Sequence, residues 1–229
     1  DRTRQALAEI AVSTRKWANM NEKAYFYDKT MSFDDYHESR WVSWPFHLMD
    51  CCLVTDAGAA IVVTSIEKAK DTKKNPIKIL GVGEGHDHGS LISQMPDLTR
   101  TFGRNTGPRA LEMAGLDYKD IDLAMIYDSF THTVLVTLES LGFCGPGEGP
   151  DFVANQVTAP GGSFPLNTSG GGLSYTHPGM YGIFTVIEAV RQLRGETGKR
   201  QLDKCDIALA HGTGGLLSST GTVLLTSNN

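Results

Sequence analysis

The glycine-rich stretch Phe164–Phe184, FPLNTSGGGLSYTHPGMYGIF, constrains the fold of this chain most. Three consecutive glycines, Gly170–Gly172, let the backbone take positive φ angles and approach another group closely. Further on, Pro178 disfavours the helical region for His177 before it, and a helical pattern follows. The stretch predicts a tight elbow at a helix start. Its histidine is either a proton-transfer residue or an ordinary turn residue with satisfied hydrogen bonds.

The rest of the chain fits a layered α/β fold. Hydrophobic periodicity predicts helices over 1–21, 65–70, 101–115, 131–141 and 182–193, the last with Val186, Ile187, Val190 and Leu193 inward. Short apolar runs predict strands over 61–64, 77–82, 122–126, 164–166, 204–210 and 221–226. Ser32 and Asp35 predict a capped helix start, while 83–89 and 211–215 are expected to form glycine-rich loops. Ligands of such folds bind where loops leave the strand ends.

Composition excludes several classes of function. The net charge is −5, which argues against nucleic acid or an anionic membrane as the main partner, and no apolar run is long enough to span a membrane. The four cysteines lack the spacing of a zinc site or a disulfide framework, which favours a reducing, cytoplasmic compartment. His86 and His88 flank Asp87 without a third ligand, so we expect no metal.

The charged stretch Asp71–Pro76 is the best boundary between two units, residues 1–76 and 77–229. The chain opens with Asp1 in a segment that has the character of a domain interior. We therefore expect it to be part of a longer protein.

Three motifs resemble the second half of a thiolase. The elbow LNTSGGGLSYTHPGMYG is similar to the family signature NxxGGxxxxGHPxGxxG, with His177 at the general acid/base histidine. Asp50–Thr64, DCCLVTDAGAAIVVT, resembles the DGAAAVVL stretch that closes the first repeat, and Leu116–Phe130 resembles the segment that ends in NEAF. The resemblance implies that 77–229 form the second βαβαβαββ repeat and that 1–76 are the tail of the first.

Two departures bring the chain closer to the sterol-carrier-type branch. Residues 127–130 read YDSF, where ordinary thiolases have NEAF and sterol-carrier types have HDCF, so Tyr127 replaces the first residue of the motif. His211 in HGTGG takes the place of the cysteine in CxGGG.

The resemblance implies a role for each matching residue. His177 would activate a nucleophilic cysteine that lies before this chain, His211 would shuttle the α-proton, and Tyr127 with Asp128 would shape an oxyanion site. None of the chain's own cysteines has the sequence context of an activated nucleophile. The substrate-binding residues expected from the same motifs are Phe130, Gly171, Gly172, Tyr175, Tyr181 and Gly214.

Three functions follow from the resemblance. The leading hypothesis is an acyl-CoA C-acyltransferase, which cleaves a β-ketoacyl-CoA with coenzyme A as substrate or forms one by Claisen condensation, and which binds no cofactor. The alternative is a retro-aldol lyase acting on a β-hydroxyacyl-CoA, such as a steroid side chain, with an OB-fold partner. Tyr127, Tyr175 and Tyr181 motivate it, but a tyrosine base would need a shifted pKa. The third is a non-catalytic subunit or lipid carrier. A homodimer or hetero-oligomer is expected in each case.

Overall fold

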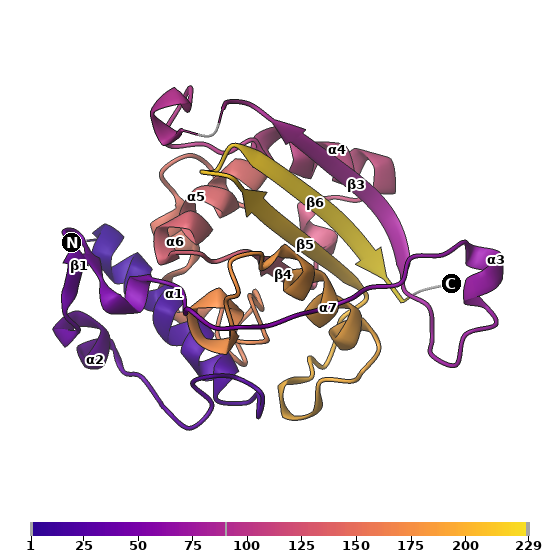
Figure 1. The fold of residues 1–229 in the computed structure, drawn as a ribbon, viewed down its shortest axis with the longest axis horizontal. Helices are drawn as coiled ribbons and strands as arrows, with labels where there is room; N and C mark the ends of the chain where they lie inside the picture. The colour runs from indigo at the N-terminus through magenta and orange to yellow at the C-terminus, as the bar shows by residue number, and fades with distance from the viewer. Residues whose placement is uncertain (1, 90, 228–229) are drawn as a thin grey trace.

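A four-stranded mixed sheet forms the centre of the molecule (Figure 1). The computed structural model describes residues 2–89 and 91–227; the first residue of the predicted opening helix and the last two of the predicted second unit lie outside it. The strand order is β3 (Lys78–His86), β6 (Ser219–Thr226), β5 (Ile207–Gly214) and β4 (Leu123–Ile126). β6 runs antiparallel to both neighbours, and β4 runs parallel to β5.

Helices cover both faces of this sheet, which makes the fold layered α/β as predicted. α1 (Arg2–Ala18), α4 (Gly103–Ala114) and α5 (Thr131–Leu141) share one hydrophobic cluster with alternate residues of the strands. α7 (Gly182–Leu193) packs on the other face with the residues between them. Because side chains alternate along a strand, β4, β5 and β6 each contribute to both clusters.

Local signals in the sequence fix several helix ends. α4 and α5 end at Gly115 and Gly142, which adopt left-handed conformations with φ of 65° and 94°. Ser32 and Asp35 form a complete capping box at α2 (Phe33–Glu38). These predictions are confirmed. The shorter elements are β1 (Trp41–Ser43), β2 (Phe46–His47), α3 (Ile66–Ala69), α6 (Gly149–Phe152), a π-helical turn (Gly171–Tyr175) and 3-10 turns at Leu48–Asp50, Ile92–Gln94, Tyr118–Asp120, Ala154–Gln156 and Gly198–Arg200.

The strand predicted over 61–64 is wrong. Residues 52–65 belong to no helix or strand, the segment is seen in Figure 1 crossing toward α3, and Val62 is 90% exposed. A strand needs a neighbour for its backbone groups, and none of the described strands lies beside this segment. The strand predicted over 164–166 is reduced to one bridge between Leu166 and Ala124.

Two predicted loops are instead strand. β3 extends through His86 and β5 extends through Gly214, because β6 pairs with both along their length. Glycine serves close packing here, since a Cβ added at Gly83 would lie 2.2 Å from the carbonyl oxygen of Thr106 in α4.

Candidate active site

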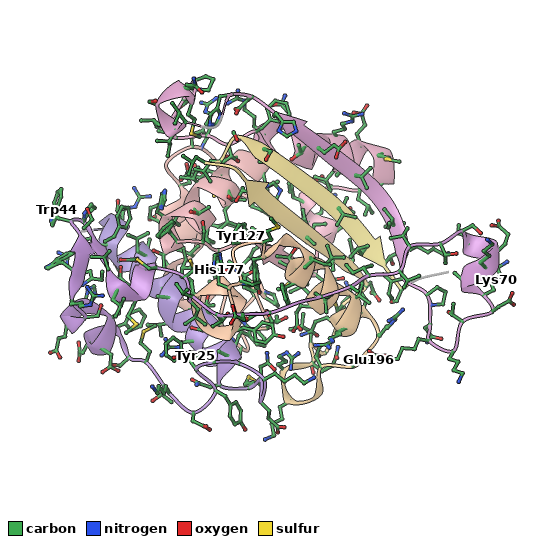
Figure 2. The ribbon with its side chains drawn as sticks, in the orientation of Figure 1. Tyr25, Trp44, Lys70, Tyr127, His177 and Glu196 are labelled. Carbon is green, nitrogen blue, oxygen red and sulfur yellow. The ribbon has the colours of Figure 1, made fainter. Side chains whose placement is uncertain are left out.

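Tyr127 and His177 form a hydrogen-bonded pair between two motifs that lie 50 residues apart. Tyr127 directly follows β4, and His177 follows the π-helical turn of the glycine elbow. The Tyr127 Oη atom lies 2.6 Å from His177 Nε2, and the rings are 5.5 Å apart with planes inclined by 21° (Figure 2). Both side chains are half-buried, so they remain within reach of a ligand.

Burial sets the protonation of this pair. It raises the pKa of Tyr127 to about 12, and the Cys52 thiol and the Asp128 carboxylate add to the shift. Burial also lowers the pKa of His177, although backbone hydrogen bonds at His177 and Leu53 oppose it. At neutral pH the phenol is therefore protonated and the imidazole is neutral. The phenol can donate and the imidazole nitrogen can accept, so the basic atom is Nε2 and the phenolate is not favoured.

The segment after β2 fixes the histidine through Thr55. Thr55 Oγ1 accepts a hydrogen bond of 2.9 Å from the His177 N–H, and the Thr55 N–H donates to the His177 carbonyl at 3.3 Å. Two residues earlier, the Leu53 N–H donates to the carbonyl oxygen of Gly172 at 2.9 Å. Thr55 lies in the stretch that resembles the end of the first repeat, but nothing in the sequence indicates this contact, because it joins residues 122 positions apart.

Asp128 clamps the glycine elbow from inside the core. Its fully buried carboxylate accepts hydrogen bonds from the N–H groups of Gly172 at 2.6 Å and Leu173 at 3.2 Å. Burial raises the pKa of Asp128 to about 7, although these hydrogen bonds lower it. Gly171 has a φ of 60°, and a Cβ there would lie 2.0 Å from Asp128 Oδ2. Asp128 thus contacts the loop that carries the histidine.

Of the other residues predicted to bind substrate, Tyr181 lies beside the Tyr127–His177 pair. Tyr181 is fully buried and stacks on His177, with centroids 6.3 Å apart, and its hydroxyl lies 3.3 Å from Ser169 Oγ. Tyr175 and Tyr181 both contact the ring of Phe184. Phe130 is 41% exposed, and Gly214 pairs with Ser219 at the end of β5.

His211 has a separate set of contacts. Its side chain is fully buried on the face of the sheet that carries α4 and α5, and Nδ1 lies 2.8 Å from Thr222 Oγ1. Nε2 has no hydrogen-bond partner among the described residues, and burial lowers the pKa to about 4. The connection to the pair runs through the backbone, because the Tyr127 N–H donates to the His211 carbonyl at 2.9 Å. A role in shuttling the α-proton stays a prediction.

The buried His211 makes the protein less stable in acid. Between its folded pKa of about 4 and its ordinary value of 6.5, the unfolded chain binds the proton and the folded chain does not, so stability rises with pH there. His211 should raise the free energy of unfolding by on the order of 3 kcal/mol between these two pH values, and we expect His211→Asn to remove this rise. Urea unfolding of both proteins between pH 4 and 7 measures how their stabilities differ with pH. Asp128, whose raised pKa lowers stability as pH rises, affects both proteins equally and drops out of this difference. Parallel curves for the two proteins would contradict this assignment.

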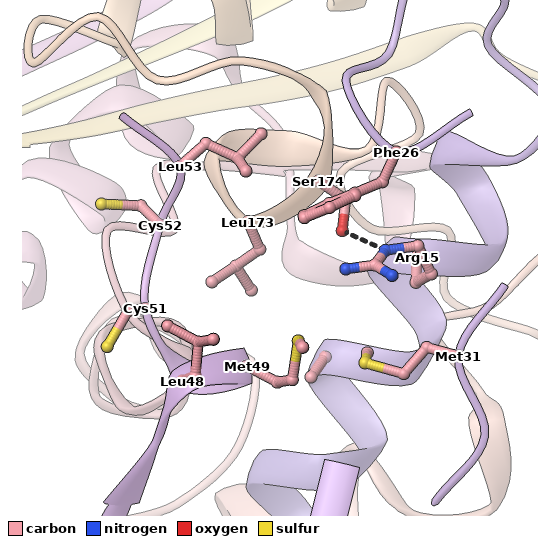
Figure 3. Close-up of a pocket in the computed structure, with 11 residues that line it drawn as sticks. Arg15, Phe26, Met31, Leu48, Met49, Cys51, Cys52, Leu53, Leu173 and Ser174 are labelled. Atoms are coloured by element: carbon pink, nitrogen blue, oxygen red, sulfur yellow. Dashed lines mark hydrogen bonds between the residues drawn. The ribbon is translucent and has the colours of Figure 1, made fainter. Parts of the chain in front are cut away.

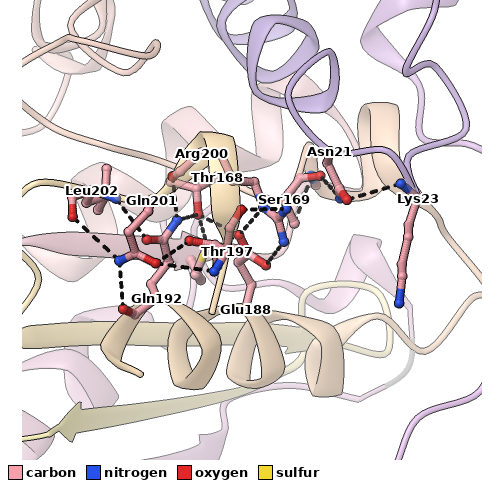
Figure 4. Close-up of polar contacts among 12 residues, drawn as sticks. Asn21, Lys23, Thr168, Ser169, Glu188, Gln192, Thr197, Arg200, Gln201 and Leu202 are labelled. Carbon is pink, nitrogen blue, oxygen red and sulfur yellow. Dashed lines mark hydrogen bonds and ion pairs between the residues drawn. The ribbon is translucent and has the colours of Figure 1, made fainter. Parts of the chain in front are cut away.

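A buried polar cluster anchors the start of the elbow to α7. The Glu188 carboxylate accepts hydrogen bonds from Arg200 at 2.8 and 3.0 Å and from the hydroxyl of Thr168 at 3.0 Å (Figure 4). Gln192 donates to the same hydroxyl at 3.1 Å. The prediction of the inward face of α7 is therefore only partly right. Leu193, Val186 and Val190 pack in the second hydrophobic cluster, but Ile187 belongs to neither cluster. Glu188 and Gln192 are instead buried in this face.

This cluster is expected to be costly to break. Glu188→Ala leaves the Arg200 guanidinium buried without a counter-charge, so we expect a loss of about 3–5 kcal/mol in the free energy of unfolding. The double replacement Glu188→Met with Arg200→Met removes both charges and should recover most of that loss. Urea unfolding of the single and the double variant measures both free energies. A double variant as unstable as Glu188→Ala would show that the cluster acts through more than charge compensation.

The cysteines of this chain are not activated. Burial raises the pKa of Cys51 above its ordinary value, that of Cys52 to about 11, and those of Cys144 and Cys205 to about 12. Each thiol is therefore protonated at neutral pH, and a protonated thiol is a weak nucleophile. Across residues 2–89 and 91–227, no three His, Cys, Asp or Glu side chains form a group that could hold a metal. In the same part of the chain, no helix combines the length and the apolar character that crossing a membrane requires.

Fold and motifs together define the protein class. The family model described as thiolase C-terminal domain-like matches residues 83–227, and the chain belongs to this family. It is similar to the 17-hydroxy-3-oxo-4-pregnene-20-carboxyl-CoA lyase of Mycobacterium tuberculosis, with 39% identity over 97% of this chain and 58% of that protein. It is also similar to the steroid side-chain-cleaving aldolase of Thermomonospora curvata, with 38% identity over 97% of this chain and 57% of that protein.

A solved structure and a further relative are similar to this chain as well. The structure named Ltp2-ChsH2(DUF35) aldolase superposes with a TM-score of 0.90 at 33% identity, covering 99% of this chain and 59% of that chain. The acetyl-CoA acetyltransferase of Methanothermobacter thermautotrophicus is 33% identical over 93% of this chain and 56% of that protein. The chain thus spans less than two thirds of each of these relatives.

Proposed function

We propose that the protein to which this chain belongs is a retro-aldol lyase that cleaves a β-hydroxyacyl-CoA. The observation that carries the proposal is the Tyr127–His177 hydrogen bond, which sets a proton donor against a neutral base where ordinary thiolases have asparagine. A retro-aldol reaction needs a base for a hydroxyl proton and an acid for the α-carbon. Similarity to two steroid-cleaving enzymes supports the same chemistry.

In the proposed mechanism, Tyr127 accepts the proton of the β-hydroxyl while its own proton passes to His177 Nε2. The Cα–Cβ bond breaks, its electron pair moves to the α-carbon as an enolate, and the β-carbon becomes a ketone. The proton then returns through the pair to the α-carbon, which yields a shortened acyl-CoA. No thiol and no free coenzyme A take part, and all electrons stay within the two products.

The substrate and partner follow from the same relatives. We propose a CoA thioester with a steroid as its acyl part, bound as substrate with no resident cofactor. The name of the similar solved structure joins Ltp2 to ChsH2(DUF35), and we propose an OB-fold partner of that kind for this protein. The free, half-buried thiols support a reducing cytoplasm. The family match to 83–227 supports the proposal that 77–229 are a second thiolase repeat preceded by the tail of the first.

Product analysis tests this function. We expect the full-length protein, with its OB-fold partner, to release a ketone and a shortened acyl-CoA from a β-hydroxyacyl-CoA in buffer without free coenzyme A. His177→Ala should abolish the release. The competing acyltransferase function, which the similarity to an acetyl-CoA acetyltransferase favours, requires free coenzyme A for cleavage. Turnover that depends strictly on added coenzyme A would overturn the lyase.

A further inference from the structure

A cavity of about 120 Å³ lies behind the segment that holds the catalytic elbow (Figure 3). Its walls come from α1, from the loop that follows α1, from residues 48–53 and from Leu173 of the π-helical turn. The side chains of Cys51 and Cys52 point away from it. On its other side the segment binds the motifs that carry the Tyr127–His177 pair, since the Cys52 N–H donates to the Ser129 carbonyl at 3.1 Å and the Leu53 N–H to the Gly172 carbonyl at 2.9 Å.

Arg15 is the charged side chain of this cavity, and none of the residues that the structure describes forms an ion pair with it. It is 4% exposed, and its guanidinium faces the space between Leu173 and Met49. All its close partners are neutral: Nε donates to Ser174 Oγ at 2.9 Å, Nη1 donates to the Lys29 carbonyl at 3.2 Å, and the guanidinium carbon lies 3.9 Å from the ring centre of Phe26.

No carboxylate of the described residues lies close enough to pair with this charge. Residues 2–89 and 91–227 contain no ion pair to Arg15. Asp35 favours the charged form from a distance, but its carboxylate is bound to Ser32 in the capping box. Burial lowers the pKa of Arg15 to about 10, so the guanidinium is still charged at neutral pH. A buried charge is costly unless it is paired.

We propose that this cavity binds a small organic carboxylate. The planar guanidinium matches the two oxygens of a carboxylate, and Met31, Met49 and Leu173 offer apolar walls for a short hydrocarbon chain. An apolar cavity of about 150 Å³ takes one benzene molecule, so this one takes a ligand of about six non-hydrogen atoms. Butanoate has that size and that charge.

Binding of butanoate to the full-length protein tests the site without any turnover. We expect saturation-transfer NMR and calorimetry to show binding with a Kd of about 1 mM, as a ligand of this size allows. Butan-1-ol and butylamine, which have a similar chain without the negative charge, should bind at least ten-fold more weakly. Equal binding of butan-1-ol would overturn the proposal, as would absence of butanoate binding, which is the outcome if another part of the protein fills the cavity.

Two variants separate the charge from the space. Arg15→Met should weaken butanoate binding at least ten-fold without lowering thermal stability, because it removes an unpaired buried charge. Ala11→Leu should fill part of the cavity and weaken binding while Arg15 stays in place, which covers the case that Arg15→Met does not fold. Arg2→Met on the exposed part of α1 is the matched control. Unchanged binding in either cavity variant would refute the site.

Discussion

Replacing Tyr127 by phenylalanine is expected to lower kcat for cleavage of a β-hydroxyacyl-CoA by about 10²- to 10⁴-fold, the usual contribution of a positioned acid or base. The change removes one oxygen and with it the 2.6 Å hydrogen bond to His177. The ring itself, which packs against His177 and Tyr181, stays. Because the lost group acts on the reacting proton, kcat should fall with little change in KM. Steady-state kinetics with the full-length protein measure both.

Tyr181→Phe is the matched control for that experiment. Tyr181 is a second tyrosine in contact with His177, but its hydroxyl bonds Ser169 at 3.3 Å and is fully buried. We expect its loss to change kcat less than ten-fold. Equal losses in the two variants would mean that the aromatic stack matters and the Tyr127 hydroxyl does not.

Replacing Gly171 by alanine should strongly destabilise the fold. The residue has a φ of 60°, and its Cβ would lie 2.0 Å from Asp128 Oδ2. The carboxylate would have to move and lose its hydrogen bonds to the elbow. Backbone strain and the lost buried hydrogen bonds together predict a loss of about 3–5 kcal/mol in the free energy of unfolding. Urea unfolding followed by tryptophan fluorescence measures it.

Gly179→Ala isolates the contact from the backbone effect. Gly179 also has a positive φ, of 86°, but an added Cβ would meet nothing within 4 Å. Its replacement should therefore cost only the strain of the left-handed conformation, about 1–2 kcal/mol. If Gly171→Ala were no more destabilising than Gly179→Ala, Asp128 would not be the clamp that we describe.

Sequence reasoning found the parts of the fold that local chemistry determines. Gly142 could be recognised as the end of α5, and Ser32 as a helix cap, because these residues act on neighbours a few positions away. The elbow was recognisable because glycines and a proline restrict their own backbone. The periodicity of α7 gave its bounds correctly, but it did not reveal that Glu188 would be buried, since its partner Arg200 lies outside the helix.

Contacts between distant segments could not be predicted in this way. Tyr127 and His177 were both candidates, but their hydrogen bond depends on how β4 and the elbow pack. The side of the sheet taken by His211 depends on its pairing with Thr222 in β6. A tyrosine that acts as a base would need a lowered pKa, but burial raises the pKa of Tyr127. The hydrogen bond from Tyr127 to His177 makes the histidine the base instead. Whether 61–64 forms a strand depends on a partner that the described residues do not supply.

The most direct test of the central claim gives one preparation of the full-length protein two substrates in parallel. One is a β-hydroxyacyl-CoA without free coenzyme A, and the other is the corresponding β-ketoacyl-CoA with free coenzyme A. A lyase that works through Tyr127 and His177 predicts rapid cleavage of the hydroxy compound, loss of that cleavage in Tyr127→Phe, and little thiolysis of the keto compound. Preferred thiolysis of the keto compound, with the hydroxy compound left intact, would contradict it.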